Sequence, residues 1–287
     1  MEGLGKYRMG DNDINNDVRL EILISTMHKT SLSFIEQMFP YQDLEKLYIL
    51  VVNQTEKGKE LVSGFKNVRV INSYEKGLSL SRNIALKNAI GDICLIADDD
   101  IEYLPNFDKI ILNSFHESPM ASIIRFKINT YSGRPYKVYP SASKRLISKK
   151  DILNTSSVEI ALKREHIVKN KISFNTLFGL GSYFTSGEEY LFLKEVLKVN
   201  LKVYFENTPI VLHKFERSTS NTASDDFVKA QAAIYAHDYN KLSYLFLFKF
   251  IFFLLRKRLI LIKDFKKKYQ TGLSAIDEYQ KLEHARL

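Results

Sequence analysis

Short apolar runs alternate with helix-like segments over the first hundred residues of this 287-residue chain. Four of the runs are typical of buried strands: residues 20–25 (LEILIS), 47–52 (LYILVV), 67–72 (NVRVIN) and 92–97 (DICLIA). Between the last two, residues 81–90 have apolar side chains at helical spacing, and Gly91 stands where that helix is expected to stop. The alternation predicts a largely parallel α/β sheet, whose ligand crevice lies at the carboxyl ends of the strands.

The later part of the chain is less regular. We expect helices at residues 105–116 and 188–199, and long loops over the sheet at residues 131–157. Short strands are expected at residues 157–162, 203–205 and 210–212. The basic, Ser-rich residues 134–150 either face an anionic acceptor or form a solvated loop.

Charge is distributed unevenly along the chain. The net charge of +9 by itself suggests nucleic acid or an anionic membrane as a partner. Residues 241–287 have a net charge of +7, however, so the remainder has only +2. A content of 45% hydrophobic and 26% charged residues excludes a mostly disordered chain. The single cysteine, Cys94, excludes an internal disulfide framework and favours a reducing, cytosolic setting, and the polar residues 1–19 lack the pattern of a secretory signal.

Three aspartates, Asp98, Asp99 and Asp100, follow the apolar run at residues 92–97. Adjacent carboxylates repel each other, and a hard divalent cation such as Mg²⁺ or Mn²⁺ would offset that repulsion while binding diphosphate oxygens. The alternative is a solvated acidic turn. The end of a strand in an α/β sheet is a favoured position for a site, and the chain has no P-loop motif.

Two further segments carry candidate groups. In residues 77–83 (GLSLSRN), Arg82 could pair with a phosphate or stack on a base, or the segment could be a plain helix start with Ser79 or Ser81 as its N-cap. In residues 186–189 (SGEE), a carboxylate could act as a general base, or Ser186 and Glu189 could form a capping box. His213 could be a third metal ligand or a structural histidine.

Together these segments resemble family 2 glycosyltransferases of the GT-A fold, of the bacterial surface-polysaccharide type. The matching order is a strand ending at residues 25–26, the turn VVNQT, the segment EKGLSLSRN, the motif GDICLIADDD, and GEE at a helix start. The resemblance covers about residues 20–220, and residues 77–100 are its most specific part. It implies a Rossmann-like, mostly parallel central sheet flanked by helices, which forms a GT-A domain at residues 20–225. Residues 1–19 are then a polar N-terminal segment, and 226–287 a helical, basic and apolar tail.

The resemblance also implies roles for individual residues. The nucleotide-binding set would be Ser25, Thr26, Asn53, Arg82, Asp98 and Asp99. The metal, Mn²⁺ or Mg²⁺, would be bound by Asp98, Asp100 and His213. Glu189 falls on the position of the catalytic base, with Glu188 as the alternative base. Asn53 replaces the usual aspartate, which leaves the identity of the nucleotide open.

The implied function is an inverting, metal-dependent transfer of a sugar from a nucleotide-sugar donor, UDP-linked in our expectation, to a hydroxyl of a glycan or lipid-linked acceptor in surface polysaccharide synthesis. A sugar nucleotidyltransferase is one alternative, although residues 25–33 lack the glycine-rich loop expected of that class. A non-catalytic module that binds a nucleotide-sugar or a glycan is the other alternative.

The tail contains an apolar, Phe-rich segment at residues 242–255, followed by basic clusters. The segment falls short of the about 20 apolar residues that a spanning helix needs. We expect residues 242–268 to lie on an anionic membrane surface, and the protein to be cytoplasmic and peripheral on the inner face of the membrane. The alternatives are a helix packed on the catalytic body or on a second subunit of a homo-oligomer, and a spanning helix. A continuous apolar segment does not form a groove that follows phosphates, so nucleic acid is not an expected partner.

Overall fold

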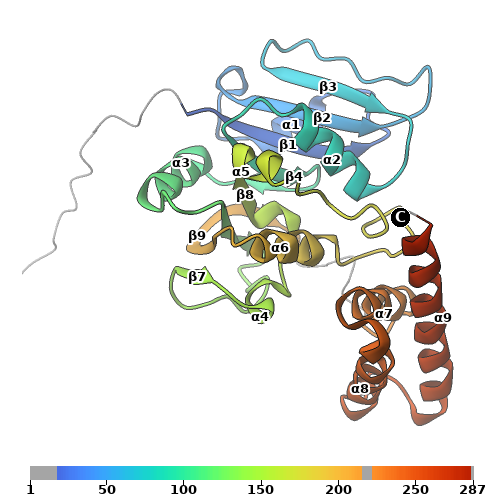
Figure 1. Ribbon diagram of the computed structural model, residues 1–287. Helices are drawn as coiled ribbons and strands as arrows, with labels where there is room; N and C mark the ends of the chain where they lie inside the picture. Colours follow the sequence, from blue (N-terminus) through green and yellow to red (C-terminus); the bar gives the residue numbers. More distant parts are fainter. Residues whose placement is uncertain (1–17, 215–221, 286–287) are drawn as a thin grey trace, which may run out of the picture.

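The structure, a computed structural model, describes the chain apart from residues 1–17, 215–221 and 286–287 (Figure 1). Its centre is a nine-stranded sheet with the order β3-β2-β1-β4-β8-β6-β9-β5, and β7 pairs with β9. The strands are β1 (Leu20–Met27), β2 (Tyr48–Gln54), β3 (Val68–Ser73), β4 (Ile93–Asp98), β5 (Glu102–Tyr103), β6 (Ile123–Thr130), β7 (Lys144–Leu146), β8 (Ile160–Lys163) and β9 (Val203–His213).

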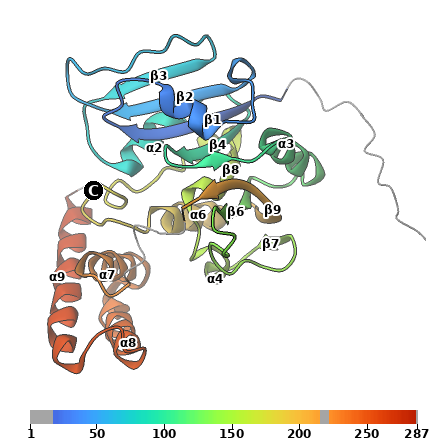
Figure 2. The ribbon, with the colours of Figure 1, turned by 180° about the vertical axis from the view of Figure 1, so that it is seen from behind.

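Nine α-helices are found in the described residues. They are α1 (Ser33–Met38), α2 (Leu78–Asn88), α3 (Phe107–Glu117), α4 (Lys149–Ile152), α5 (Arg164–Lys169), α6 (Glu188–Lys198), α7 (Asp225–Tyr239), α8 (Ser243–Arg256) and α9 (Phe265–His284). Figures 1 and 2 show α7, α8 and α9 as a separate group of helices on one side of the sheet.

The first half of the sheet is parallel, as the sequence predicts. Strands β3, β2, β1 and β4 are neighbours that all run in one direction. The predicted α/β class is therefore confirmed. The second half mixes directions, because β8 runs antiparallel to both β4 and β6, whereas β9 runs parallel to β6.

Alternate residues of the central strands point into two separate cores. On β1, Leu23 belongs to a core with α2, α5 and α6, whereas Ile22 and Ile24 belong to a core with α1 and α3. Because these strands are buried on both faces of the sheet, their sequences are continuous apolar runs. The helices cover both faces and leave the carboxyl edge of the sheet to the site.

Three details of the later half differ from the sequence-based expectations. Residues 157–162 begin as a short 3₁₀ turn and become strand only at Ile160. The expected strands at 203–205 and 210–212 are one strand, β9, with an irregular register against β6. The expected loop at 131–157 contains β7 and α4, and α4 starts at a capping box made by Ser148 and Asp151.

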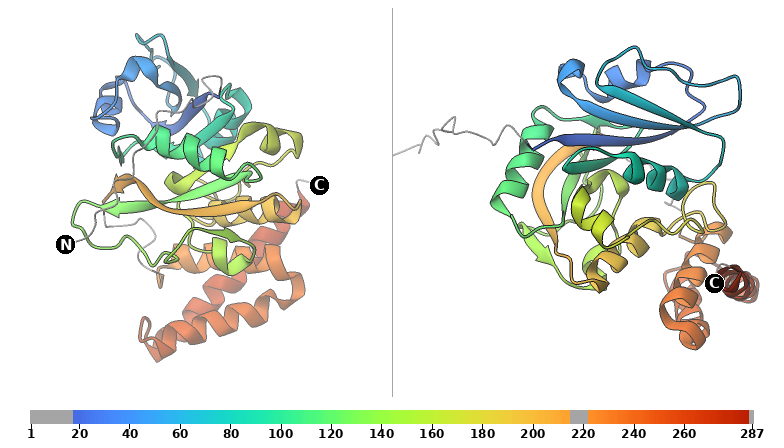
Figure 3. Two further views of the ribbon diagram at one scale, coloured as in Figure 1. Left: turned by 90° about the vertical axis from the view of Figure 1, so that its left-hand side faces the viewer. Right: turned by 45° about the horizontal axis from the view of Figure 1, so that its top comes forward.

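The C-terminal helices pack on one another and on the body. Leu247, Ile251 and Leu254 are the buried face of α8, and a Cβ on Gly272 of α9 would lie 2.4 Å from Leu247. Such close contact between α8 and α9 requires glycine at that position. Figure 3 shows these helices extending away from the sheet. In the part of the chain that the structure describes, no helix is both long enough and apolar enough to cross a bilayer.

Candidate active site

Parallel strands bring the first group of predicted site residues together. Ser25 on β1 pairs with Asp98 on β4, so both lie at the carboxyl edge of the sheet. Ser25, Thr26 and the three aspartates line a cavity of about 740 Å³. A crevice at this edge of an α/β sheet is the usual ligand position, and the volume is typical of a ligand pocket.

Arg82 connects the sheet edge to the start of α6. It projects from α2, and its side chain is only 1% exposed. One guanidinium nitrogen lies 3.1 Å from Asp98, and the other lies 3.2 Å from both Glu188 and Glu189. The alternative in which Ser79 or Ser81 is the N-cap and Arg82 is exposed is therefore wrong. Helix α2 begins after Gly77, and Arg82 is buried. Arg82 lines the cavity, but its charge is engaged by carboxylates.

This cluster sets the protonation of its members. Burial alone would lower the pKa of Arg82, but Asp98, Glu189 and Glu188 outweigh burial and raise it. Burial, reinforced by the charge of Glu189, raises the pKa of Glu188 to about 8. One cation cannot balance three carboxylates, so Glu188 retains a proton at neutral pH. Its Oε2 has no hydrogen-bond partner among the described residues.

Helix α6 begins without the predicted capping box. Its N-cap is Gly187, whose φ of +103° is in the region that favours glycine, and no side-chain cap is formed among the described residues. The Ser186–Glu189 capping box is therefore wrong, because Glu189 turns to Arg82 instead of back to the helix start. The side chain of Glu189 is 17% exposed, compared with 6% for Glu188, so Glu189 is the more accessible carboxylate in the cavity.

The three aspartates have different partners. Asp98 accepts a hydrogen bond from Ser157 in addition to its contact with Arg82. Asp99 accepts from Thr26 and pairs with Lys29 at 3.0 Å. Among the described residues, the Asp100 carboxylate has only an approach to a histidine, and its side chain is 55% exposed. Asp98 and Asp99 are thus engaged in contacts within the protein, whereas the carboxylate of Asp100 is accessible.

Asp100 and His213 lie close enough to act together. The Nε2 atom of His213 is 3.9 Å from an Asp100 oxygen. Its Nδ1 lies 2.9 Å from the carbonyl of Lys214, and since a carbonyl can only accept, Nδ1 carries the hydrogen. In the neutral imidazole, Nε2 is then the atom whose lone pair a metal ion would bind. The described residues contain no group of three or more potential metal-ligating His, Cys, Asp or Glu side chains, because Asp98 is turned to Arg82.

Asn53 does not line the cavity. It is fully buried, and its side-chain amide bonds to the backbone of Lys29 and to Asn72. The next residue, Gln54, lines the cavity instead and accepts a hydrogen bond of 2.7 Å from the backbone of Gly77. Asn53 therefore orders the segment that carries Lys29, which in turn pairs with Asp99.

Sequence reasoning missed one wall of the cavity. Tyr136 lines it and lies against His213, with ring centroids 5.4 Å apart. Helix α7 also lines it, through Phe227, Gln231 and Ile234. Spacing of i, i+4 and i+7 puts these three side chains on one face of a helix, but the sequence does not indicate which partner that face meets.

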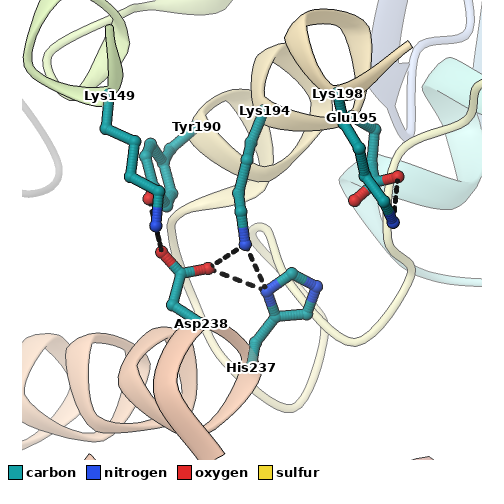
Figure 4. Close-up of polar contacts among 7 residues, drawn as sticks. All are labelled: Lys149, Tyr190, Lys194, Glu195, Lys198, His237 and Asp238. Atoms are coloured by element: carbon teal, nitrogen blue, oxygen red, sulfur yellow. Dashed lines mark hydrogen bonds and ion pairs between the residues drawn. The ribbon is translucent and has the colours of Figure 1, made fainter.

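A buried carboxylate fastens α7 to α6 (Figure 4). Asp238 on α7 accepts a hydrogen bond of 2.6 Å from Tyr190 and pairs with Lys194, both on α6. Lys149 on α4 approaches Asp238 at 3.2 Å, and the neighbouring His237 lies at 3.0 Å. These partners lower the pKa of Asp238 against the effect of burial. A charged, multiply bonded carboxylate between two helices fixes their relative position.

Comparisons with known proteins agree with this geometry. A family model for glycosyl transferase family 2 matches residues 24–182, which is more than half of the chain. An uncharacterized glycosyltransferase of Haemophilus influenzae is 21% identical over 230 residues, with 76% of this chain and 75% of the relative covered. Crystal structures of S. aureus TarS 1–349, alone and with UDP-GlcNAc, have TM-scores of 0.57 and 0.59 at 14% identity, and 91% of this chain and 81% of that chain are covered.

The structural likeness shows the GT-A fold that the resemblance implied. The family match, in turn, includes the strand ends, Arg82 and the aspartate triplet. The chain thus belongs to glycosyl transferase family 2.

Proposed function

We propose that the protein transfers a sugar, with inversion, from a UDP-sugar to a hydroxyl of a glycan or lipid-linked acceptor in surface polysaccharide synthesis. The observation that carries this proposal is the shared cavity: the aspartates of the sheet edge and the carboxylates of α6 line it together, joined by Arg82. The crystal structure of S. aureus TarS with UDP-GlcNAc supports a UDP-linked donor.

Glu189 is the proposed general base. It removes the proton from the acceptor hydroxyl as that oxygen bonds to the anomeric carbon, and the bond from that carbon to the diphosphate oxygen breaks on the opposite face, which inverts the configuration. Glu188 is a weaker candidate, because its raised pKa keeps it protonated at neutral pH. Arg82 positions both carboxylates by hydrogen bonds to their Oε1 atoms.

The donor is proposed to lie along the sheet edge. Ser25, Thr26, Asp98 and Asp99 line that side of the cavity, and Arg82 lies beneath it. Asn53 supports this side from behind through its contacts with Lys29 and Asn72. The nucleotide and the sugar would thus be held between the strand ends and the start of α6.

The residues of the cavity offer a divalent cation only some of the ligands that it needs. Asp100 offers an exposed carboxylate and His213 a correctly oriented Nε2, and a hard cation accepts the remaining ligands from diphosphate and water. Asp98 would join this set only if its contacts with Arg82 and Ser157 were exchanged. We propose Mn²⁺ or Mg²⁺ at this position, where the ion would stabilise the charge that develops on the departing diphosphate.

The C-terminal helices are proposed to rest on an anionic membrane at the cytoplasmic face. The side chains of Leu245, Phe248 and Phe252 on α8 are 50%, 47% and 53% exposed, on the side opposite its buried residues. Basic residues accompany this apolar stripe: Lys249, Arg256, Lys257, Arg258, Lys263, Lys266 and Lys267. Aromatic side chains beside Lys and Arg match an interface of acyl chains and anionic headgroups.

A panel of nucleotide-sugars tests the proposed function. The protein is incubated with Mn²⁺ and each UDP-sugar, and release of UDP to water is measured. We expect slow hydrolysis of at least one donor, and a loss of about 10²–10⁴ in rate for Glu189→Gln with unchanged donor binding. Glu195→Gln, at a more exposed position on the same helix, is the matched control.

Three results would count against the proposal. Wild-type rates in Glu189→Gln would remove the assignment of the base. Donor binding without any turnover would indicate a binding module. Formation of a nucleotide-sugar from a nucleoside triphosphate and a sugar phosphate would indicate a nucleotidyltransferase.

A further inference from the structure

One face of α7 forms a wall of the cavity, and this wall has no role in the proposed donor site or as the proposed base. Phe227, Gln231 and Ile234 are half-buried and line the cavity together with Glu188 and Glu189. Helix α7 lies outside the residues that the family model matches. The wall is thus a property of this chain's C-terminal helices.

The wall is held rigidly beside the proposed base. A Cβ on Gly187, the residue before α6, would lie 2.5 Å from Ile234, so α7 packs directly on the start of α6. Asp238 joins the far end of α7 to Tyr190 and Lys194 of α6 (Figure 4). These contacts place the α7 wall at a set distance from Glu189, as a substrate subsite requires.

The chemistry of this side of the cavity is polar but uncharged. The cavity lining also includes Leu153, Asn154, Thr155 and Ser156. Among the described lining residues, the only lysine or arginine is Arg82, and three carboxylates already engage it. A phosphate in this place would find no free cation in the described lining and several carboxylates nearby, which disfavours an anionic group.

Gln231 places a side-chain amide on this wall. An amide offers two donor positions and two acceptor lone pairs, so it can bond to more than one hydroxyl of a ligand. Phe227 adds an aromatic face one helical turn away.

We propose that the α7 wall is the acceptor subsite and that it binds an uncharged sugar ring. Phe227 packs against the apolar face of the ring, Gln231 bonds to adjacent hydroxyls, and the reacting hydroxyl points to Glu189. The inference rests on the proposed transfer reaction. It extends that proposal by excluding a phosphate-bearing group at the acceptor position.

Acceptor kinetics test the subsite. The probes are methyl and octyl glycosides of glucose, galactose and N-acetylglucosamine, compared with glucose 6-phosphate and glycerol 3-phosphate. With the UDP-sugar that the wild-type protein hydrolyses, a neutral glycoside should accelerate UDP release and be glycosylated, and the phosphorylated probes should not. Preference for octyl over methyl glycosides would indicate a lipid-linked sugar, and equal use would indicate a free glycan.

Variants of the wall separate this inference from the proposed function. Gln231→Ala and Phe227→Leu should each raise the acceptor KM by about tenfold, the effect of losing one good contact. Hydrolysis of the donor by water should stay within about twofold of wild type, because the donor side is intact. Lys229→Ala is the matched control, since Lys229 is exposed on α7 and does not line the cavity.

Several results would overturn the subsite. These are unchanged acceptor KM values in both wall variants, use of the phosphorylated probes alone, and donor hydrolysis that no neutral glycoside accelerates. If the wild-type protein hydrolyses no nucleotide-sugar at all, the proposed function itself fails, and the inference fails with it.

Discussion

Arg82 on α2 and Glu188 on α6 are 106 positions apart in the chain, yet a buried ion pair of 3.2 Å joins their side chains. The same guanidinium reaches Glu189 and Asp98. One arginine thus connects the proposed donor side of the cavity with the proposed base.

Replacing Arg82 should destabilise the fold. In Arg82→Met the three carboxylates lose the cation that they share in the interior, which costs about 3–5 kcal/mol for a buried pair that is broken on one side. Arg82→Lys should lose less, because the charge stays but one ammonium group cannot span three carboxylates. Urea denaturation measures both. Arg145→Met, at an exposed position on β7, should change the free energy of unfolding by less than about 0.5 kcal/mol. A loss below about 1 kcal/mol for Arg82→Met would contradict the network's structural role.

Glu188 should make stability fall as the pH rises. Its pKa is near 4.5 as an ordinary glutamate and about 8 in the folded protein, so between these values the folded state holds one more proton than the unfolded state. The free energy of unfolding then decreases by about 1.4 kcal/mol per pH unit over this window, and Glu188 contributes no slope below or above it.

Denaturation of Glu188→Gln between pH 5 and 9 measures this effect. The difference in free energy between the variant and the wild type should grow in the variant's favour as the pH rises from about 5 to 8. Glu195→Gln should show no such trend, because Glu195 is 39% exposed and pairs with Lys198 at the surface (Figure 4). Parallel pH profiles for wild type and Glu188→Gln would show that Glu188 is ionised in the folded protein.

Donor binding should depend on Asp100 and His213. Calorimetric titration of UDP with Mn²⁺ and with EDTA should show tighter binding with the metal in the wild type. Asp100→Ala and His213→Ala should each remove most of that difference, since each supplies one of the two ligands that the structure places together. His116→Ala, exposed on α3, should retain it. Equal UDP affinity in Mn²⁺ and in EDTA would count against the proposed ion.

The exposed face of α8 should carry membrane binding. Phe248→Ser combined with Phe252→Ser should reduce co-sedimentation with phosphatidylglycerol vesicles by at least about tenfold. Each Phe is about half exposed, so its burial in the membrane contributes about half of the roughly 1.5–3 kcal/mol for a fully buried Phe. Val62→Ser should bind as wild type does, because Val62 is an apolar residue that is 79% exposed on another surface. Point substitutions are preferable to truncation, because α9 packs against α7, the helix that carries the cavity wall.

Vesicle binding should also weaken with salt and on neutral lipids, because part of it is electrostatic. Unchanged binding in the double variant would remove α8 from the interface. If the double variant instead converts a dimer into a monomer in sedimentation, the face belongs to a second copy of the chain.

The sequence alone determined the parallel half of the sheet and the position of the aspartates at its carboxyl edge. Buried strands have a local signature, since residues such as Ile22, Leu23 and Ile24 must all be apolar when both faces are covered. The ends of such strands converge at one edge, where Asp98 lies beside Ser25, whereas Asn53, at the end of the next strand, is buried by its own contacts.

Only the tertiary structure decided which charged groups meet in the interior. Arg82, Glu188 and Glu189 each have an ordinary local interpretation at a helix start, and the cluster exists because α2 and α6 pack against the same face of the sheet. Likewise, the spacing that puts Phe227, Gln231 and Ile234 on one face of α7 is visible in the sequence, but the partner of that face is not. Local patterns depend on neighbours within a few residues, whereas these contacts depend on how distant elements pack, and that packing places Phe227 and Gln231 beside the proposed base.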